Sequence, residues 1–260
     1  MGLFNFLKKF VYSQPNQASR TNTINNKCND YFNFFNYSTG QIKKITYQQY
    51  KKIVYNSFGN IPEKYLKNEI KIYEYSEQIA NKLNAKELNF LKENNRDPYY
   101  RFNCLQLPNI DLDENTTYGR LVNVVGTLIK INPSTAWNVL LFIDSLPIYP
   151  EIGYKLIFYE TYAIDIWKYY DDNLNIQIGI NIALRLFDII KHNINTIEFK
   201  NSYSKILIKL CNNLYKIGKS NEAIEIATFC LNHDFKDTSK GGWEGRINKF
   251  KKERKEYNEH

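Results

Sequence analysis

The 110 residues after Pro150 contain no further proline, and this absence limits the fold more than any other feature of the sequence. A proline inside a helix removes a backbone hydrogen bond and clashes with the preceding turn, so a proline-free stretch can carry long helices. Apolar residues recur through this stretch with the helical period of about 3.6 residues, whereas half-buried strands would alternate with a period of about two. The pattern predicts an all-α fold.

Helices are also predicted in the middle of the chain. The aromatic cluster at residues 31–37 is expected to pack against the rest of the protein, and Thr46 is the expected N-cap of a helix that follows it. Pro62 suits the first turn of the next helix. That helix is expected to run to about Asn94, with a break at Asn84.

Residues 95–116 hold two prolines and an acidic run, and they are expected to form a loop. Apolar residues then repeat at helical spacing over 118–129, although the Val-Asn-Val-Val run in this segment is also compatible with a strand. The Asn-Pro-Ser sequence at 132–134 is typical of a helix start, and Pro147 and Pro150 are expected to end that helix.

The N-terminal residues are expected to form an amphipathic helix and then a flexible tether. Over residues 2–12 the apolar side chains occupy one arc of a helical wheel, and Lys8 and Lys9 lie on the other side. We expect this helix to dock on the protein's own core or on a partner, and contact with a membrane surface is the alternative. Residues 13–30 show no apolar periodicity, which is typical of a tether.

The positive charge of the chain is concentrated at its two ends. The net charge is +8, of which residues 1–60 carry +7 and residues 236–260 carry +3, while residues 61–235 carry −2. Basic ends can bind nucleic acid, anionic lipid or an acidic protein, and they also favour solubility. They leave nucleic-acid binding or processing as an alternative function.

No motif in the sequence supports catalysis, a cofactor or a metal ion. The phosphate-binding patterns GxxxxGK[ST] and GxGxxG are both absent. The triplet at 69–71, Glu-Ile-Lys, matches half of a metal-nuclease motif but lacks a clear upstream aspartate. The cysteines and histidines are too scattered for a zinc site; they are Cys28, Cys104, Cys211, Cys230, His192, His233 and His260.

The sequence also favours a cytoplasmic protein. No apolar run reaches the roughly 18 residues that a membrane-spanning helix needs. The start of the chain lacks the cleavage site typical of a signal peptide. We therefore expect reduced thiols, with Cys211 and Cys230 on apolar helix faces.

Two segments of the C-terminal part are similar to each other. The sequence IALRLFDIIKHN at 182–193 resembles AIEIATFCLNHD at 223–234. With a period of 40 residues, Ala183 aligns with Ala223, Phe187 with Ala227 and Ile190 with Cys230. Residues 202–234 resemble one tetratricopeptide repeat, and residues 155–193 match a second repeat more loosely. The positions that carry the resemblance are Leu207, Leu210, Cys211, Leu214, Gly218 and Ala223.

The resemblance implies a tetratricopeptide-like array of helical hairpins in the C-terminal part, and the tether predicted at 13–30 adds a flexible N-terminal arm. Ser220 and Ala227 depart from the family pattern, which has aromatic residues at these positions. The chain then divides into three predicted parts: the helix and tether at 1–30, a helical middle region at 31–150, and the hairpin array with its cap and basic tail at 151–260.

The sequence KDTSKGGWEGRI at 236–247 resembles a tail of bacterial proteins that end in such a hairpin. Gly241 and Gly242 are expected to adopt positive φ and turn the chain back. Trp243 is then expected to cover the apolar end of the last hairpin, because a helical array needs a cap at its terminus. The alternative for Trp243 is a stacking platform for single-stranded nucleic acid, beside basic residues such as Arg246.

The best candidate site is a polar stripe on the helix predicted at 203–217. The stripe consists of Lys205, Lys209, Asn212 and Lys216, at positions i, i+4, i+7 and i+11. In tetratricopeptide proteins the first helix of each hairpin lines a groove, so the resemblance implies that this stripe holds acidic groups of a protein or peptide partner. The alternative is an ordinary solvated helix face. The sequence thus predicts non-catalytic protein–protein interaction.

Overall fold

The computed structural model describes five stretches of the chain, which are residues 31–36, 41–58, 74–94, 114–197 and 200–258. The predicted N-terminal helix and tether, the triplet at 69–71, and Cys28, Cys104 and His260 lie outside the described residues. The two remaining histidines and two remaining cysteines lie within them.

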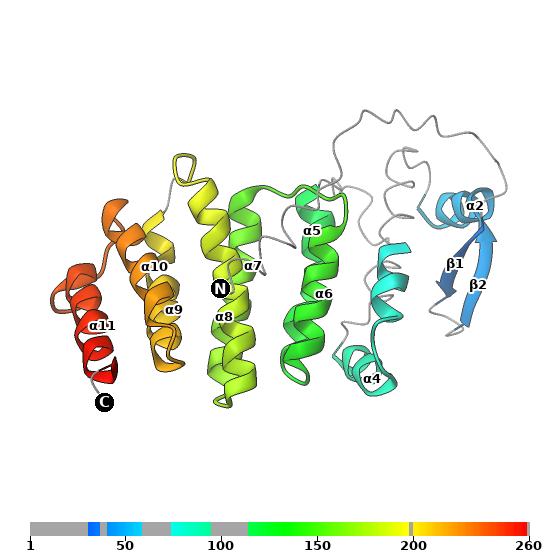
Figure 1. Ribbon diagram of the computed structural model, residues 1–260. Coiled ribbons are helices and arrows are strands. Elements are labelled where there is room, and N and C mark those ends of the chain that lie inside the picture. Colours follow the sequence, from blue (N-terminus) through cyan, green and yellow to red (C-terminus); the bar gives the residue numbers. More distant parts are fainter. Residues whose placement is uncertain (1–30, 37–40, 59–73, 95–113, 198–199, 259–260) are drawn as a thin grey trace.

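The described residues are mostly helical, which confirms the predicted all-α class. The helices are α2 (Tyr47–Phe58), α4 (Ala85–Glu93), α5 (Glu114–Leu128), α6 (Pro133–Ser145), α7 (Ile152–Tyr169), α8 (Asn173–His192), α9 (Ser204–Lys216), α10 (Ser220–Asn232) and α11 (Gly242–Asn258). Residues 74–80 are also helical, and a 3₁₀ turn, Lys200–Tyr203, leads into α9. Figure 1 shows α5 to α11 side by side in one row. Helix α11 forms one end of this row, and α4 and α2 lie beyond the other end, which α5 and α6 form.

A small β-hairpin precedes α2, and the prediction of a purely helical middle region missed it. Strand β1 (Tyr31–Asn36) pairs antiparallel with β2 (Gln41–Thr46), so that Tyr31 lies opposite Thr46. Aromatic and β-branched residues favour strands, and both segments are rich in them. The hairpin is an addition to the helical fold because only these two strands form the sheet in the described part of the chain.

The predicted helix starts agree with the structure where it describes them. Thr46 caps α2, because its Oγ1 accepts the N–H of Gln49 at 3.2 Å and the Gln49 side chain accepts the N–H of Thr46 at 2.8 Å. The break at Asn84 is confirmed, since Asn84 and Glu87 cap α4 in the same reciprocal way. The segment that was compatible with a strand is helix α5, which already begins at Glu114, inside the predicted loop.

Successive helices pair in the row: α5 packs on α6, α7 on α8, α9 on α10, and α11 on α10. One hydrophobic core runs from Ile45 to Phe250. Helix α6 also packs on α8, so the core continues across Pro150, where the middle region was predicted to end. The side chains that the repeat alignment matched, Ala183 with Ala223 and Ile190 with Cys230, are buried in α8 and α10.

Two glycines on one face of α5 let aromatic side chains of α7 approach closely. A methyl group added at Gly126 would lie 3.0 Å from the ring of Tyr162, and one added at Gly119 would overlap the hydroxyl of Tyr154. The Tyr162 hydroxyl donates a hydrogen bond to the backbone carbonyl of Val122. These contacts place α7 beside α5, although α6 lies between them in the sequence.

Candidate functional site

The predicted polar stripe lies on the solvent side of α9. Its opposite face is buried and consists of Ile206, Leu207, Leu210, Cys211 and Leu214. Lys205 and Lys216 are exposed, while Lys209 and Asn212 are half-buried. The stripe therefore keeps the geometry that the helical spacing predicted, with four polar side chains in one row along the helix.

Lys209 is the most enclosed lysine of the stripe. Its ammonium group lies 5.4 Å from the ring centroid of Trp167 on α7, within the range of a cation–π contact. Burial lowers the pKa of Lys209, and the nearby charge of Lys216 lowers this pKa further. A carboxylate placed beside the stripe would offset the repulsion between the two lysines.

No acidic side chain neutralises these lysines in the described residues. The ion pairs found there are Lys155–Asp144, Arg185–Asp144, Lys191–Glu225 and Arg246–Asp237. None of them involves Lys205, Lys209 or Lys216. Among the described residues, the stripe thus presents three cationic groups without a carboxylate partner.

Arg246, which was named beside Trp243 as a candidate partner-binding residue, joins three elements of the fold. Its Nε donates to the carboxylate of Asp237 at 2.5 Å, and its Nη1 donates to the amide oxygen of Asn212 at 2.9 Å. The Asp237 side chain is almost fully buried. Arg246 thereby ties α11 to α9 and to the loop after α10. The Asn212 oxygen is also occupied, which leaves its amide N–H groups for a partner.

Trp243 lies in the core at the end of the row of helices. Its side chain is 3% exposed, and its Nε1–H donates to the carbonyl of Phe235 at 2.8 Å. Gly241 and Gly242 have φ values of +84° and +57°, as the turn was predicted to require. The ring therefore packs as a cap, and its faces are not open for base stacking.

A buried carboxylate that the sequence analysis did not single out joins four helices. Asp144 on α6 has a side chain that is 1% exposed and lies 2.6 Å from the ammonium of Lys155 on α7. It also accepts hydrogen bonds from Tyr118 on α5 at 3.2 Å and from Tyr159, and it pairs with Arg185 on α8 at 3.4 Å. No local pattern in the sequence could have indicated this cluster, because its members come from four separate helices.

The side chains around Asp144 form a network of ion pairs and hydrogen bonds that stabilises the fold. Burial and the Asp144 carboxylate both raise the pKa of Tyr118, so its phenol stays protonated and donates. Each oxygen of Asp144 has two cationic or hydroxyl partners, which compensates for the removal of the charge from water.

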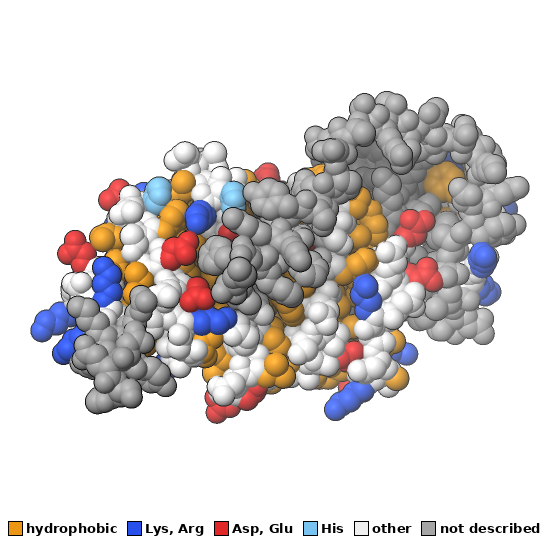
Figure 2. Space-filling model, viewed as in Figure 1, with side chains coloured by type: hydrophobic (Ala, Val, Ile, Leu, Met, Phe, Trp, Pro, Cys, Tyr) orange, Lys and Arg blue, Asp and Glu red, His pale blue; other side chains and the backbone are white. Residues whose placement is uncertain are grey.

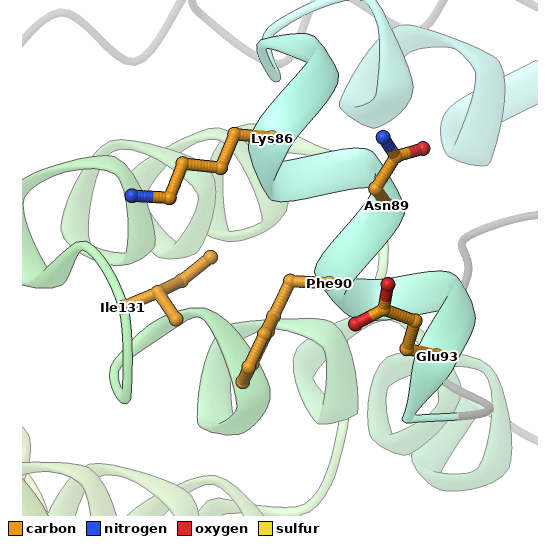
Figure 3. A pocket seen from close by; sticks show the side chains of 5 residues that line it. All are labelled: Lys86, Asn89, Phe90, Glu93 and Ile131. Carbon is orange, nitrogen blue, oxygen red and sulfur yellow. The ribbon is translucent and has the colours of Figure 1, made fainter.

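An open hollow lies between α4 and the turn that joins α5 to α6. It has a volume of about 460 Å³ and is lined by Lys86, Asn89, Phe90, Glu93 and Ile131. Figure 3 shows the Phe90 and Ile131 side chains near each other, with Asn89 and Glu93 beside Phe90 along α4. The lining lacks a nucleophile with an adjacent base, so it does not have the composition of an acyl-transfer or hydrolytic site.

The cysteines and histidines of the described residues do not form a reactive or metal-binding group. Cys211 and Cys230 are buried as predicted, and burial raises the pKa of the Cys211 thiol to about 12. His192 ends α8 and His233 follows α10, so each lies at a helix C-terminus. No cluster of three or more metal-ligating side chains occurs in the part of the chain that the structure describes.

In the described stretches, no helix is both long enough and apolar enough to cross a membrane. Comparison of the chain with protein-family models, with curated proteins and with solved structures found no match in any of the three.

Proposed function

We propose that the chain is a non-catalytic helical-repeat protein that binds another protein through the solvent face of α9. The observation that carries this proposal is the row of three lysines, Lys205, Lys209 and Lys216, without an acidic partner among the described residues. Unpaired cations aligned on a rigid helix favour an acidic ligand, because the ligand supplies the missing counter-charges without any rearrangement of the scaffold.

The arrangement of the helices supports a tetratricopeptide-like interpretation of the C-terminal part. Helices α7 to α10 form two consecutive pairs, and α11 follows them as a cap. The turn residue Gly218 has φ +78°, and the matched positions Leu207, Leu210 and Ala223 are fully buried. In such arrays the first helix of each pair lines the binding groove, and α9 is the first helix of the pair that it forms with α10.

Nucleic-acid binding through the basic ends is the alternative. Figure 2 shows Lys and Arg side chains over α11, at the end of the row of helices. The burial of Trp243 removes the stacking platform that this alternative would use. Phosphate contacts would make binding fall steeply with salt concentration, whereas a protein complex with apolar contacts should persist.

The test is a pull-down of the tagged full chain from its native cells, with half of the sample treated with nuclease. We expect a defined protein to survive nuclease and to be lost from the K205E/K216E variant. The charge-matched control is K251E/K252E, which changes two exposed lysines of α11 by the same total charge. Loss of all bound material with nuclease, or loss only from the control variant, would refute the proposal in favour of nucleic acid.

A further inference from the structure

Helix α7 exposes an apolar ridge that the core does not use. Ile157 is 56% exposed and Ile164 is 36% exposed. Thr161 and Lys168 are also exposed and continue the same line, since residues spaced by three and four lie on one face of a helix. The opposite face of α7 is buried and consists of Leu156, Tyr159, Tyr162, Ala163 and Ile166.

The two flanks of α7 show where this ridge lies relative to the other helices. On one flank, Phe158 meets Tyr118 of α5 edge to ring, with centroids 6.1 Å apart. On the other flank, Trp167 lies under the ammonium group of Lys209 on α9. The ridge is therefore bounded by α5 on one side and by α9 on the other.

The ridge and the lysine stripe consequently form one surface. Lys209 belongs to the stripe on α9 and contacts Trp167 on the flank next to the ridge. From Lys205 to Lys216 the stripe extends about 16 Å along the α9 axis, and Ile157 and Ile164 are about 10 Å apart along α7. A segment of about three helical turns would be long enough to lie across both.

The composition of this surface selects the chemistry of its ligand. The aliphatic ridge favours apolar side chains, and the adjacent lysines favour carboxylates. The apolar residues at 2–12 of this chain are a poor match, because Lys8 and Lys9 would add positive charge beside the stripe. A nucleic acid would match the lysines but would leave the isoleucines without an apolar contact.

We propose that the surface formed by α7 and α9 binds an acidic amphipathic segment of a partner protein. The aliphatic side chains of the segment cover Ile157 and Ile164, and its carboxylates pair with Lys205, Lys209 and Lys216. This inference rests on the proposed function and adds the chemical class of the bound segment and a second, apolar half of the binding surface.

The experiment measures the binding of a fluorescein-labelled synthetic peptide to the full chain by fluorescence anisotropy. The peptide has about 15 residues, with leucines at helical spacing and glutamates on the adjoining face. Two control peptides replace its glutamates with lysines or its leucines with glutamines. We expect each replacement to weaken binding by about tenfold or more.

On the protein side, the variant I157Q/I164Q should weaken binding of the acidic peptide by about tenfold, as should K205E/K216E. The control is L174Q, which changes a leucine on α8 that is 66% exposed and lies outside this surface, and it should leave the affinity unchanged. Circular dichroism before and after each substitution confirms that the helices remain folded.

Absence of binding by the acidic peptide, equal binding of the lysine-substituted peptide, or an unchanged affinity of I157Q/I164Q would each overturn the inference. Failure of the proposed function would give a different pattern of binding by the two variants in the pull-down. If the native partner is lost from K205E/K216E but kept by I157Q/I164Q, the proposed function stands and the apolar half of the surface does not. If the native partner is kept by K205E/K216E, the proposed function itself fails.

Discussion

The carboxylate of Asp144 on α6 lies 2.6 Å from the ammonium of Lys155 on α7, and this pair joins two helix pairs of the row. Arg185 of α8 and the hydroxyl of Tyr118 on α5 contact the same carboxylate. A single buried charge thus holds four helices in register, and α7, which carries the apolar ridge, is one of them.

Replacement of Asp144 by asparagine should destabilise the fold strongly. The amide keeps the volume of the side chain but leaves Lys155 and Arg185 without their anion, and its N–H₂ group would face other donors. We expect a loss of about 2–4 kcal/mol in the free energy of unfolding, measured by urea denaturation. The control is D171N on an exposed aspartate, which should change stability by less than about 0.5 kcal/mol.

Gly179 on α8 should not tolerate alanine. A methyl group there would lie 2.4 Å from Nε1 of Trp167, so the indole would have to shift. We expect G179A to cost about 1–3 kcal/mol and to change the tryptophan fluorescence. Gly153 on α7 provides the matched control, because a methyl group there meets nothing within 4 Å. G153A should be neutral or stabilise the helix by up to about 1 kcal/mol; equal losses for both variants would contradict the clash.

Removal of the Trp243 ring should uncover the end of the array. The ring fills the core and satisfies the carbonyl of Phe235, so W243A should cost about 3–5 kcal/mol. W243F keeps an aromatic ring but loses the hydrogen bond, and it should cost about 1–3 kcal/mol. Thermal denaturation checks both values, and a W243A variant as stable as the parent protein would show that the ring is not a cap.

The ion pair between Asp237 and Arg246 should make the C-terminal cap sensitive to acid. Burial by itself raises the pKa of Asp237, but hydrogen bonds from Arg246 and Ser239 and the charge of Arg246 outweigh it, so this pKa lies below its ordinary value. A lowered folded-state pKa contributes stability that is fully present above the unfolded-state value of about 3.9. This contribution is lost as the pH falls through the folded-state pKa.

The measurement compares the parent protein with D237N by urea denaturation between pH 7 and pH 3. At neutral pH the parent should be more stable by about 1.5–3 kcal/mol, the usual value of a charge-assisted hydrogen bond. The difference should shrink only below about pH 4. A difference that is constant over the whole range would mean that the Asp237 charge does not contribute.

The helix caps show what could be predicted from short stretches of the chain. Thr46 and Asn84 were predicted to start or interrupt helices, and each makes its capping bonds to a residue three positions away. The turn at Gly241 and Gly242 is equally local. The burial of Cys211 followed from the helical spacing of its apolar neighbours, because one helix face must pack against the rest of the protein.

The paired strands β1 and β2 and the position of Arg246 show why the remainder could not be predicted. A short aromatic run is compatible with a helix or a strand, and pairing with β2 decides between them. Arg246 was expected to face a partner, but it donates hydrogen bonds to the carboxylate of Asp237 and to the amide oxygen of Asn212. These groups come together only after α9 and α11 have packed.

The sequence by itself determined the helical class, the helix starts and the lysine row on α9, because each depends on residues within about one or two turns of one another. Only the tertiary structure decided that Asp144 meets Lys155 and Arg185, that Trp243 is buried, and that Trp167 on the flank of α7 contacts Lys209. These contacts join side chains from different helices, and their geometry is set by how the helices pack rather than by any local spacing.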